Sequence, residues 1–313
     1  MSFTAEVKDE LSRVKPECQN CDKAELAALI RICGTLIVTG RDTYRLEVST
    51  ETGAVARMVI KLVHKVYDLK TELTVRRSVL HRSHNYLIAL PAQEKLADAL
   101  VELGVLEASG GLESGIKRNL VAEDHCAASY LRGAFLGGGF IADPKGDFHF
   151  EMVFQHKSLA KDIVELLARL SIESRLAKRR NEYTVYIKSI NEMLDFLALV
   201  GAHQSALKIE NVRVVKALRN DVNRQVNAEM ANQAKASAAA YEQLKMIDLI
   251  DKNQGIESLP QGLYELAKLR REYPDLNLRE LGQMASLPLS KSAVYHRIRR
   301  LEEIANTIKK GMS

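Results

Sequence analysis

The sequence lacks most features that would place the protein outside a reducing cell interior. Tryptophan is absent, aromatic residues make up 5%, and only four cysteines occur in 313 residues. So few cysteines cannot form the disulfide framework of a small secreted protein. No apolar run approaches the roughly 18 residues of a membrane helix, and the N-terminus lacks the apolar core of a signal peptide. We therefore expect a soluble, cytoplasmic protein with no membrane association.

The sequence also lacks a large excess of charge of either sign. Lys and Arg number 45 against 40 acidic residues, which gives a net charge of +5. This balance permits nucleic-acid binding without indicating it, so local clusters of charge must decide. Hydrophobic residues (46%) and charged residues (27%) are balanced as in ordinary globular proteins. At roughly 150 residues per domain, the length predicts about two domains.

The first two thirds of the chain contain an internal repeat. The segment 26–34 resembles 131–139 at an offset of 105 residues, and Asp42 and Asp147 keep that offset in the turns that follow. Strand and helix patterns then recur in the same order in both halves. The offset falls to 97 at the closing helices, so the first half has about eight extra residues, which we place around 77–84. The repeat predicts two αββαββα units that form one pseudo-symmetric α+β domain.

The domain organisation predicted from these patterns has four parts. The first is an amphipathic N-terminal helix, whose Phe3, Val7, Leu11 and Val14 share one face. A helical pattern without glycine or proline follows the repeat, and a Gly/Pro cluster separates it from a short, all-helical end. The predicted parts are the N-terminal helix (1–22), the duplicated domain (23–218, halves 23–115 and 125–218), a linker helix (219–253) and an all-α domain (254–313).

Small residues recur in both copies of the repeated motif. Glycine costs up to about 1 kcal/mol per helix position relative to alanine. Its repeated use therefore indicates two helices packed backbone to backbone at a seam between the halves. A phosphate-binding glycine loop is the alternative for 137–139, although no Gly-Lys-Ser/Thr follows. The small residues are Ala27, Ala28 and Gly34 in the first copy, and Gly133, Ala134 and Gly137–Gly139 in the second.

The segment 278–301, LRELGQMASLPLSKSAVYHRIRRL, has the pattern of a helix-turn-helix. Gly282 allows two helices to cross, and Ser290 is a good N-cap for the second helix. Between 291 and 300 there are four Lys/Arg and no acid. A cationic face of this kind is typical of a helix in the major groove; a solvated amphipathic helix is the alternative. The residues expected to contact DNA are Ser290, Lys291, Ser292, Tyr295, His296, Arg297, Arg299 and Arg300.

Two other basic stretches, 57–82 and 175–188, occupy equivalent places in the two halves. They are compatible with a saddle for the phosphate backbone and equally with solvated sheet edges.

Cys18 and Cys21 have metal-ligand spacing, but His125 and Cys126 lie a hundred residues away and no second pair exists. We therefore expect no metal and no cofactor, with a zinc or cluster site as the alternative. The histidines form no catalytic pattern.

The chain resembles the WhiA family of bacterial sporulation and cell-division regulators. The segments that carry the resemblance are SFTAEVKDEL, CDKAELAALIR, YLRGAFLGGGFIADP, LVGAH, RNDVNRQVNAEMAN and LRELG with LSKSAVYHRIRRLEEIA. The resemblance implies a LAGLIDADG homing-endonuclease scaffold followed by a helix-turn-helix similar to those of sigma factors. It also implies a nucleoid-associated transcription regulator of sporulation, cell division or chromosome segregation. The implied partners are double-stranded DNA and, in some relatives, a WhiB-type iron–sulfur regulator and RNA polymerase.

In LAGLIDADG nucleases, the eighth motif position carries an acid that holds a catalytic divalent metal. The corresponding residues in this chain are Cys33 and Gly138, which cannot supply a carboxylate to magnesium. Asp42, Asp143 and Asp147 follow in turn-like segments, where aspartate is common. We therefore expect no catalytic residues and no enzyme activity. The alternatives are an architectural nucleoid protein and, as a further one, an active homing-type endonuclease.

Overall fold

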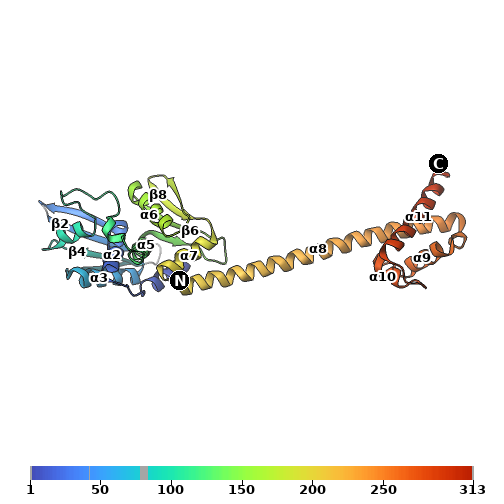
Figure 1. Cartoon of the computed structure of the whole chain (residues 1–313), viewed down its shortest axis with the longest axis horizontal. Helices are drawn as coiled ribbons and strands as arrows, with labels where there is room; N and C mark the ends of the chain where they lie inside the picture. The colour runs from blue at the N-terminus through green and yellow to red at the C-terminus, as the bar shows by residue number, and fades with distance from the viewer. Residues whose placement is uncertain (1, 42, 78–83, 312–313) are drawn as a thin grey trace. The chain divides into compact units, whose positions relative to one another are not determined.

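The structure, a computed structural model, describes residues 2–41, 43–77 and 84–311. The chain divides into two units, Met1–Lys216 and Ala217–Ser313 (Figure 1). The division falls inside the helix α8 (His203–Gln254). None of the helices in the described ranges combines the length and the apolar character needed to cross a membrane.

The first unit repeats one order of elements twice, which confirms the predicted αββαββα duplication. Its two four-stranded antiparallel sheets have the equivalent orders β1-β2-β4-β3 and β5-β6-β8-β7. The first half consists of α2 (Gln19–Cys33), β1 (Gly34–Gly40), β2 (Thr43–Thr50), α3 (Gly53–Tyr67), β3 (Glu72–Arg77), β4 (His84–Leu90) and α4 (Leu96–Glu102). The second half, which follows the short helix η1 (Arg118–Val121), consists of α5 (Asp124–Gly138), β5 (Gly139–Ile141), β6 (Phe150–Phe154), α6 (Lys157–Arg169), β7 (Arg175–Arg179), β8 (Glu182–Ile187) and α7 (Ile190–Val200).

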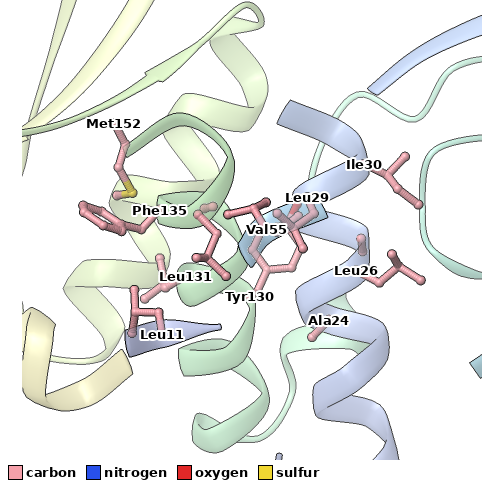
Figure 2. Packing of buried hydrophobic residues seen from close by; sticks show 14 of the residues in the cluster. Leu11, Ala24, Leu26, Leu29, Ile30, Val55, Tyr130, Leu131, Phe135 and Met152 are labelled. Atoms are coloured by element: carbon pink, nitrogen blue, oxygen red, sulfur yellow. The ribbon is translucent and has the colours of Figure 1, made fainter. Parts of the chain in front are cut away.

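The helices α2 and α5 form the seam between the halves, as the small residues predicted. A Cβ atom added to Gly133 would lie 2.4 Å from the carbonyl oxygen of Glu25 and 3.0 Å from the Cβ of Ala28. Figure 2 shows Leu29 and Tyr130 between the two helices, while Leu26 and Ile30 point away from α5. Because glycine has no side chain, it permits this approach, and the residues 137–139 belong to the end of α5 and the start of β5 rather than to a loop.

The N-terminal helix α1 (Phe3–Leu11) buries Phe3, Val7 and Leu11 against the first unit, and Ser2 is its N-cap. The pattern predicted a helix that continues to Val14, but the helix ends at Leu11. Pro16 follows closely, and the residue before a proline is pushed away from helical backbone angles. Val14 is only half-buried and packs against the same core from outside the helix.

The helix α8 begins at His203, well before the position 219 where the linker helix was expected. Gly201 adopts a positive φ of 95° and ends α7. The carboxylate of Glu10 then accepts hydrogen bonds from the amides of Gln204 (2.7 Å) and Ser205 (3.0 Å). This N-cap comes from α1, almost two hundred residues away, so local sequence did not reveal where α8 starts.

The elements of the second unit after α8 are η2 (Ile256–Ser258), α9 (Gln261–Glu272), α10 (Leu278–Gln283) and α11 (Lys291–Gly311). Their core is formed by Leu263, Leu266, Leu281, Val294 and Leu301, together with Ile247 and Ile250 of α8. The all-α end predicted for this part is therefore confirmed. The extra residues predicted around 77–84 lie largely outside the described residues, as does Asp42.

Candidate nucleic-acid interface

The helices α10 and α11 and the turn between them form the predicted helix-turn-helix. A Cβ on Gly282 would lie 2.5 Å from the carbonyl oxygen of Leu289, so a larger residue could not occupy this crossing point. The amide of Leu289 donates to the carbonyl of Gly282 at 2.8 Å and closes the turn. Asn277 and Glu280 form a capping box at the start of α10. The motif is thus held by backbone contacts as well as by its apolar core.

The second helix of the motif begins as expected at Ser290. The hydroxyl of Ser290 accepts a hydrogen bond from the amide of Ala293 at 3.2 Å. Its predicted contact with DNA therefore competes with its role as an N-cap. Val294 and Leu301 are buried and Ile298 is half-buried, which fixes the rotation of α11 about its axis.

Six of the eight residues predicted to contact DNA lie exposed on α11. They alternate with the buried residues at helical spacing, so they share the solvent side of the helix. Tyr295 is 51% exposed, and its ring lies edge-on to the ring of His296. Hydrogen-bonding side chains therefore stand next to guanidinium and ammonium groups on this surface. We call this surface the α11 face; it consists of Lys291, Ser292, Tyr295, His296, Arg299 and Arg300.

Arg297 differs from the other predicted residues because it faces the unit itself. It is half-buried, and its Nη1 donates to the carbonyl oxygen of Gly262 at 3.1 Å. The same atom lies 3.8 Å from a carboxylate oxygen of Glu265. Hydrogen bonds from Ser286 and the charge of Arg297 hold the pKa of Glu265 below its ordinary value. Arg297 thus joins α11 to α9; its spacing of three residues from Val294 and four from Leu301 places it beside the buried side of α11, but did not identify its partner.

Sequence reasoning missed two exposed apolar residues between α10 and α11. Leu287, in the turn before α11, is 78% exposed, and Met284 at the end of α10 is 47% exposed. An apolar pair in a segment such as MASLPL is typical of core residues, so the pattern gave no signal of exposure. Apolar side chains at this edge could contact a thymine methyl group or a protein.

The seam ends that carry metal ligands in LAGLIDADG nucleases are tightly packed here. A Cβ on Gly138 would lie 2.7 Å from the carbonyl oxygen of Val153, and one on Gly137 would lie 3.0 Å from the Sγ of Cys33. Position 138 therefore has no room for a carboxylate side chain. Burial raises the pKa of Cys33 to about 11, while Lys8 opposes this shift. Burial also lowers the pKa of Lys8, while the charges of Cys33 and Glu51 act to raise it.

Asp143 takes part in the turn between β5 and β6, as expected for aspartate after a helix end. Its carboxylate accepts a hydrogen bond from the amide of Lys145 at 2.9 Å, and its carbonyl accepts one from Gly146 at 3.0 Å. Asp147 is exposed in the same turn. The carboxylate of Asp143 thus serves turn geometry, which is the ordinary use of aspartate in such a position.

The open faces of the two sheets carry charges of both signs. In β2, Tyr44, Leu46 and Val48 are buried, so Arg45 and Glu47 lie on the opposite face, where they form an ion pair at 3.0 Å. In the second sheet, the guanidinium of Arg179 lies 3.4 Å from the carboxylate of Glu151. Such pairing reduces the positive potential that a phosphate saddle needs. In the second half, it favours the solvated-edge interpretation of the basic stretch 175–188.

The duplicated α+β body and the helix-turn-helix unit together define a class, that of helix-turn-helix proteins built on a LAGLIDADG-like scaffold. The chain belongs to the WhiA family. It matches the models of the WhiA N-terminal LAGLIDADG-like domain over residues 19–106, the WhiA LAGLIDADG-like domain over 127–219 and the WhiA C-terminal HTH domain over 222–305.

Relatives over nearly the whole length support this assignment. The chain is 41% identical to the probable cell division protein WhiA of Heliobacterium modesticaldum, with 97% of this chain and 96% of the relative covered. It is also 41% identical to the protein of the same name from Desulforamulus reducens, with 99% and 97% covered. The crystal structure of full-length DUF199/WhiA from Thermatoga maritima is 26% identical, covers 98% of this chain and 99% of its own, and superposes with a TM-score of 0.62.

Proposed function

We propose that the chain is a sequence-specific DNA-binding transcription regulator of bacterial cell division, chromosome segregation or sporulation. In this proposal the α11 face reads bases in the major groove, and the LAGLIDADG-like body has no nuclease activity. Double-stranded DNA is the proposed partner, in association with the nucleoid. A WhiB-type regulator and RNA polymerase are further proposed partners, suggested by the family alone.

The observation that supports this function is the arrangement of the α11 face. Cations, a phenol and an imidazole are exposed together on one side of the second helix of a helix-turn-helix, and the opposite side is buried. Arg and Lys side chains can contact guanine edges or phosphates, and Ser, Tyr and His add hydrogen bonds. A merely solvated helix would have no need to exclude acids from 291–300.

Substituting alanine for Arg299 is expected to weaken binding to the preferred DNA sequence by about 1–3 kcal/mol, which is about 5- to 150-fold in Kd. The reason is the loss of a bidentate contact to a base. The preferred site is first found by selection of bound genomic fragments, and affinity is then measured by fluorescence anisotropy on this site and on a scrambled duplex. The preference between the two should fall in the variant.

Two matched variants make this test specific. Arg297→Ala removes a guanidinium from the same helix, but one that is bound to Gly262, so it should reduce thermal stability and leave base preference unchanged. Lys291→Ala should weaken binding to both duplexes equally and flatten the salt dependence if Lys291 contacts phosphate. If Arg299→Ala binds both duplexes as the unaltered protein does, α11 is not the reading helix.

Equal affinity of the unaltered protein for the selected site and for random DNA would favour the second candidate, an architectural nucleoid protein. Such proteins bind through the phosphate backbone with little base contact. The exposed phenol and imidazole of Tyr295 and His296 support base reading, because both groups can hydrogen-bond to base edges as well as to phosphates.

The proposed loss of nuclease activity gives a separate prediction. Incubation of supercoiled plasmid with the protein and Mg²⁺ or Mn²⁺ should produce no nicked or linear DNA, because neither Cys33 nor Gly138 offers a carboxylate to clamp a metal. Nicking that is abolished by Asp42→Ala or Asp147→Ala would overturn the prediction. Nicking that persists in both variants would indicate a contaminating nuclease, which a mock purification would detect.

A further inference from the structure

The structure brings together four side chains that the sequence keeps a hundred residues apart. Cys18 and Cys21 lie at the start of α2, and His125 and Cys126 lie in the first turn of α5. In the described part of the chain, this is the one place where three or more potential metal-binding His, Cys, Asp or Glu side chains gather. Cys21 and Cys126 are buried, and Cys18 and His125 are half-buried.

The six distances among the four donor atoms are those of a small tetrahedron. The Sγ atoms are separated by 3.6 Å (Cys18–Cys21), 3.7 Å (Cys18–Cys126) and 3.8 Å (Cys21–Cys126). The Nδ1 of His125 lies 3.9 Å from Cys18, 3.2 Å from Cys21 and 3.3 Å from Cys126. Bond lengths of about 2.3 Å for Zn–S and 2.0–2.1 Å for Zn–N give tetrahedral edges of about 3.8 Å between sulfurs and about 3.6 Å between sulfur and nitrogen.

The surroundings of these donors suit thiolates bound to a cation. Cys18 is the N-cap of α2, and His125 and Cys126 occupy the first turn of α5, so two helix N-termini favour the negative charge of the sulfurs. The side-chain amide of Asn20 lies 3.3 Å from the Sγ of Cys126, to which it donates. The same amide group also donates to the carbonyls of Asn119 and Leu120. Such hydrogen bonds to a ligand are typical of metal sites.

We propose that Cys18, Cys21, His125 and Cys126 bind one zinc ion, which holds the first turns of the seam helices α2 and α5 together. Four protein ligands close the coordination sphere, so the site is structural rather than catalytic. A cluster of several iron and sulfide atoms does not fit among donors that are at most 3.9 Å apart. The ion would join the two halves at the end of the seam opposite to Cys33 and Gly137, which meet at its other end.

The site also fixes the connection between the halves. Through Asn20, the residues 119 and 120 before α5 are tied to α2 beside the proposed ion. A cross-link between residues about 105 apart removes many conformations from the unfolded chain. The sequence predicted no metal because no second cysteine pair exists and His125 and Cys126 lie a hundred residues from Cys18 and Cys21; the fold brings the four side chains together.

The experiment measures metal in the full-length protein. Protein purified under reducing conditions is expected to contain one zinc per chain by inductively coupled plasma mass spectrometry. After removal of the metal by a chelator, Co²⁺ should restore one equivalent and give the visible d–d bands of a tetrahedral site together with thiolate charge-transfer absorption. Zinc should also raise the midpoint of thermal unfolding of the chelated protein.

Three serine variants separate this site from nonspecific binding. Cys18→Ser keeps a good N-cap for α2 and should still fold, but it should lose the metal or bind it at least tenfold more weakly. Cys126→Ser should do the same. Cys33→Ser, which alters the one cysteine outside the cluster, should retain one equivalent and the same Co²⁺ spectrum.

Three results would overturn the proposal. The first is reduced, folded protein that takes up neither Zn²⁺ nor Co²⁺. The second is metal binding that is unchanged in Cys18→Ser and Cys126→Ser. The third is a disulfide between two of these cysteines, found by mass spectrometry of protein that was kept reduced and offered zinc. The Co²⁺ spectrum of the unaltered protein tests the site even where a variant does not fold.

Discussion

Substituting methionine for Arg132 is expected to lower the free energy of unfolding of the first unit by about 3–5 kcal/mol. The guanidinium is 5% exposed and donates from Nε and Nη2 to the two carboxylate oxygens of Glu25, at 2.8 and 3.0 Å. It also donates to the hydroxyl of Ser129 (3.0 Å) and to the carbonyl of Val200 (3.3 Å). Methionine fills the space but leaves the buried carboxyl without a partner. Chemical denaturation followed by circular dichroism would measure the loss.

Two controls distinguish the lost pair from lost packing. Arg13→Met removes an ion pair with Asp9 from an arginine that is 73% exposed, so it should change stability by less than about 0.5 kcal/mol. The double variant Arg132→Met, Glu25→Leu removes both buried groups and should recover much of the stability. A double variant no more stable than Arg132→Met would show that packing, rather than the unpaired carboxyl, dominates.

The penalty in Arg132→Met should also depend on pH. Burial raises the pKa of Glu25 from 4.5 to about 7, although Arg132 opposes the shift. A carboxyl whose pKa is raised on folding binds its proton more tightly in the folded state. Its contribution to folding stability is therefore present below the pKa of the unfolded state, and it is lost as the pH rises through the pKa of the folded state. Without Arg132 the pKa rises further, so the variant should be less destabilised at about pH 5 than at about pH 8.

Substituting valine for Gly133 is expected to destabilise the same seam by about 3 kcal/mol or more. The new Cβ would lie 2.4 Å from the backbone oxygen of Glu25, which cannot move without displacing α2. Helix propensity alone predicts the opposite sign for Gly133→Ala, a gain of about 1 kcal/mol. Both variants should therefore unfold at lower denaturant concentration, with valine worse than alanine.

Gly40→Ala is the matched control for this prediction. A Cβ on Gly40 meets its nearest neighbour, Thr43, at 3.6 Å, an ordinary contact, and the backbone of Gly40 is not in the left-handed region. Its stability should change by less than about 0.5 kcal/mol. A Gly133→Ala variant more stable than the unaltered protein would show that α2 and α5 can move apart easily. Backbone contact would then not set the distance between these two helices.

Most of the fold was accessible from the sequence because its signals are local or repeated. The strand pairs and helices of both halves follow hydrophobic periodicity, and the offset between Leu26 and Leu131 reveals the duplication before any contact is known. The buried positions of α11 likewise follow from the spacing of Val294, Ile298 and Leu301.

What the sequence did not show depends on contacts between distant segments. Arg297 lies three residues after Val294 and four before Leu301, beside the buried stripe of α11, but nothing in the sequence shows that Gly262 of α9 accepts its hydrogen bond. Cys18 and His125 are unrelated in sequence but adjacent once α2 and α5 lie side by side. In each case a partner from another element decides the role of the side chain, and periodicity contains no information about that partner.

The carboxylate of Glu10 joins the first helix of the chain to the amides at the start of α8. During synthesis the acceptor leaves the ribosome long before its donors, so this junction is among the last parts of the first unit to form. Deleting the N-terminal helix would therefore fray the start of α8 at Gln204 and Ser205, so a change at the beginning of the polypeptide would weaken a helix near the end of the first unit.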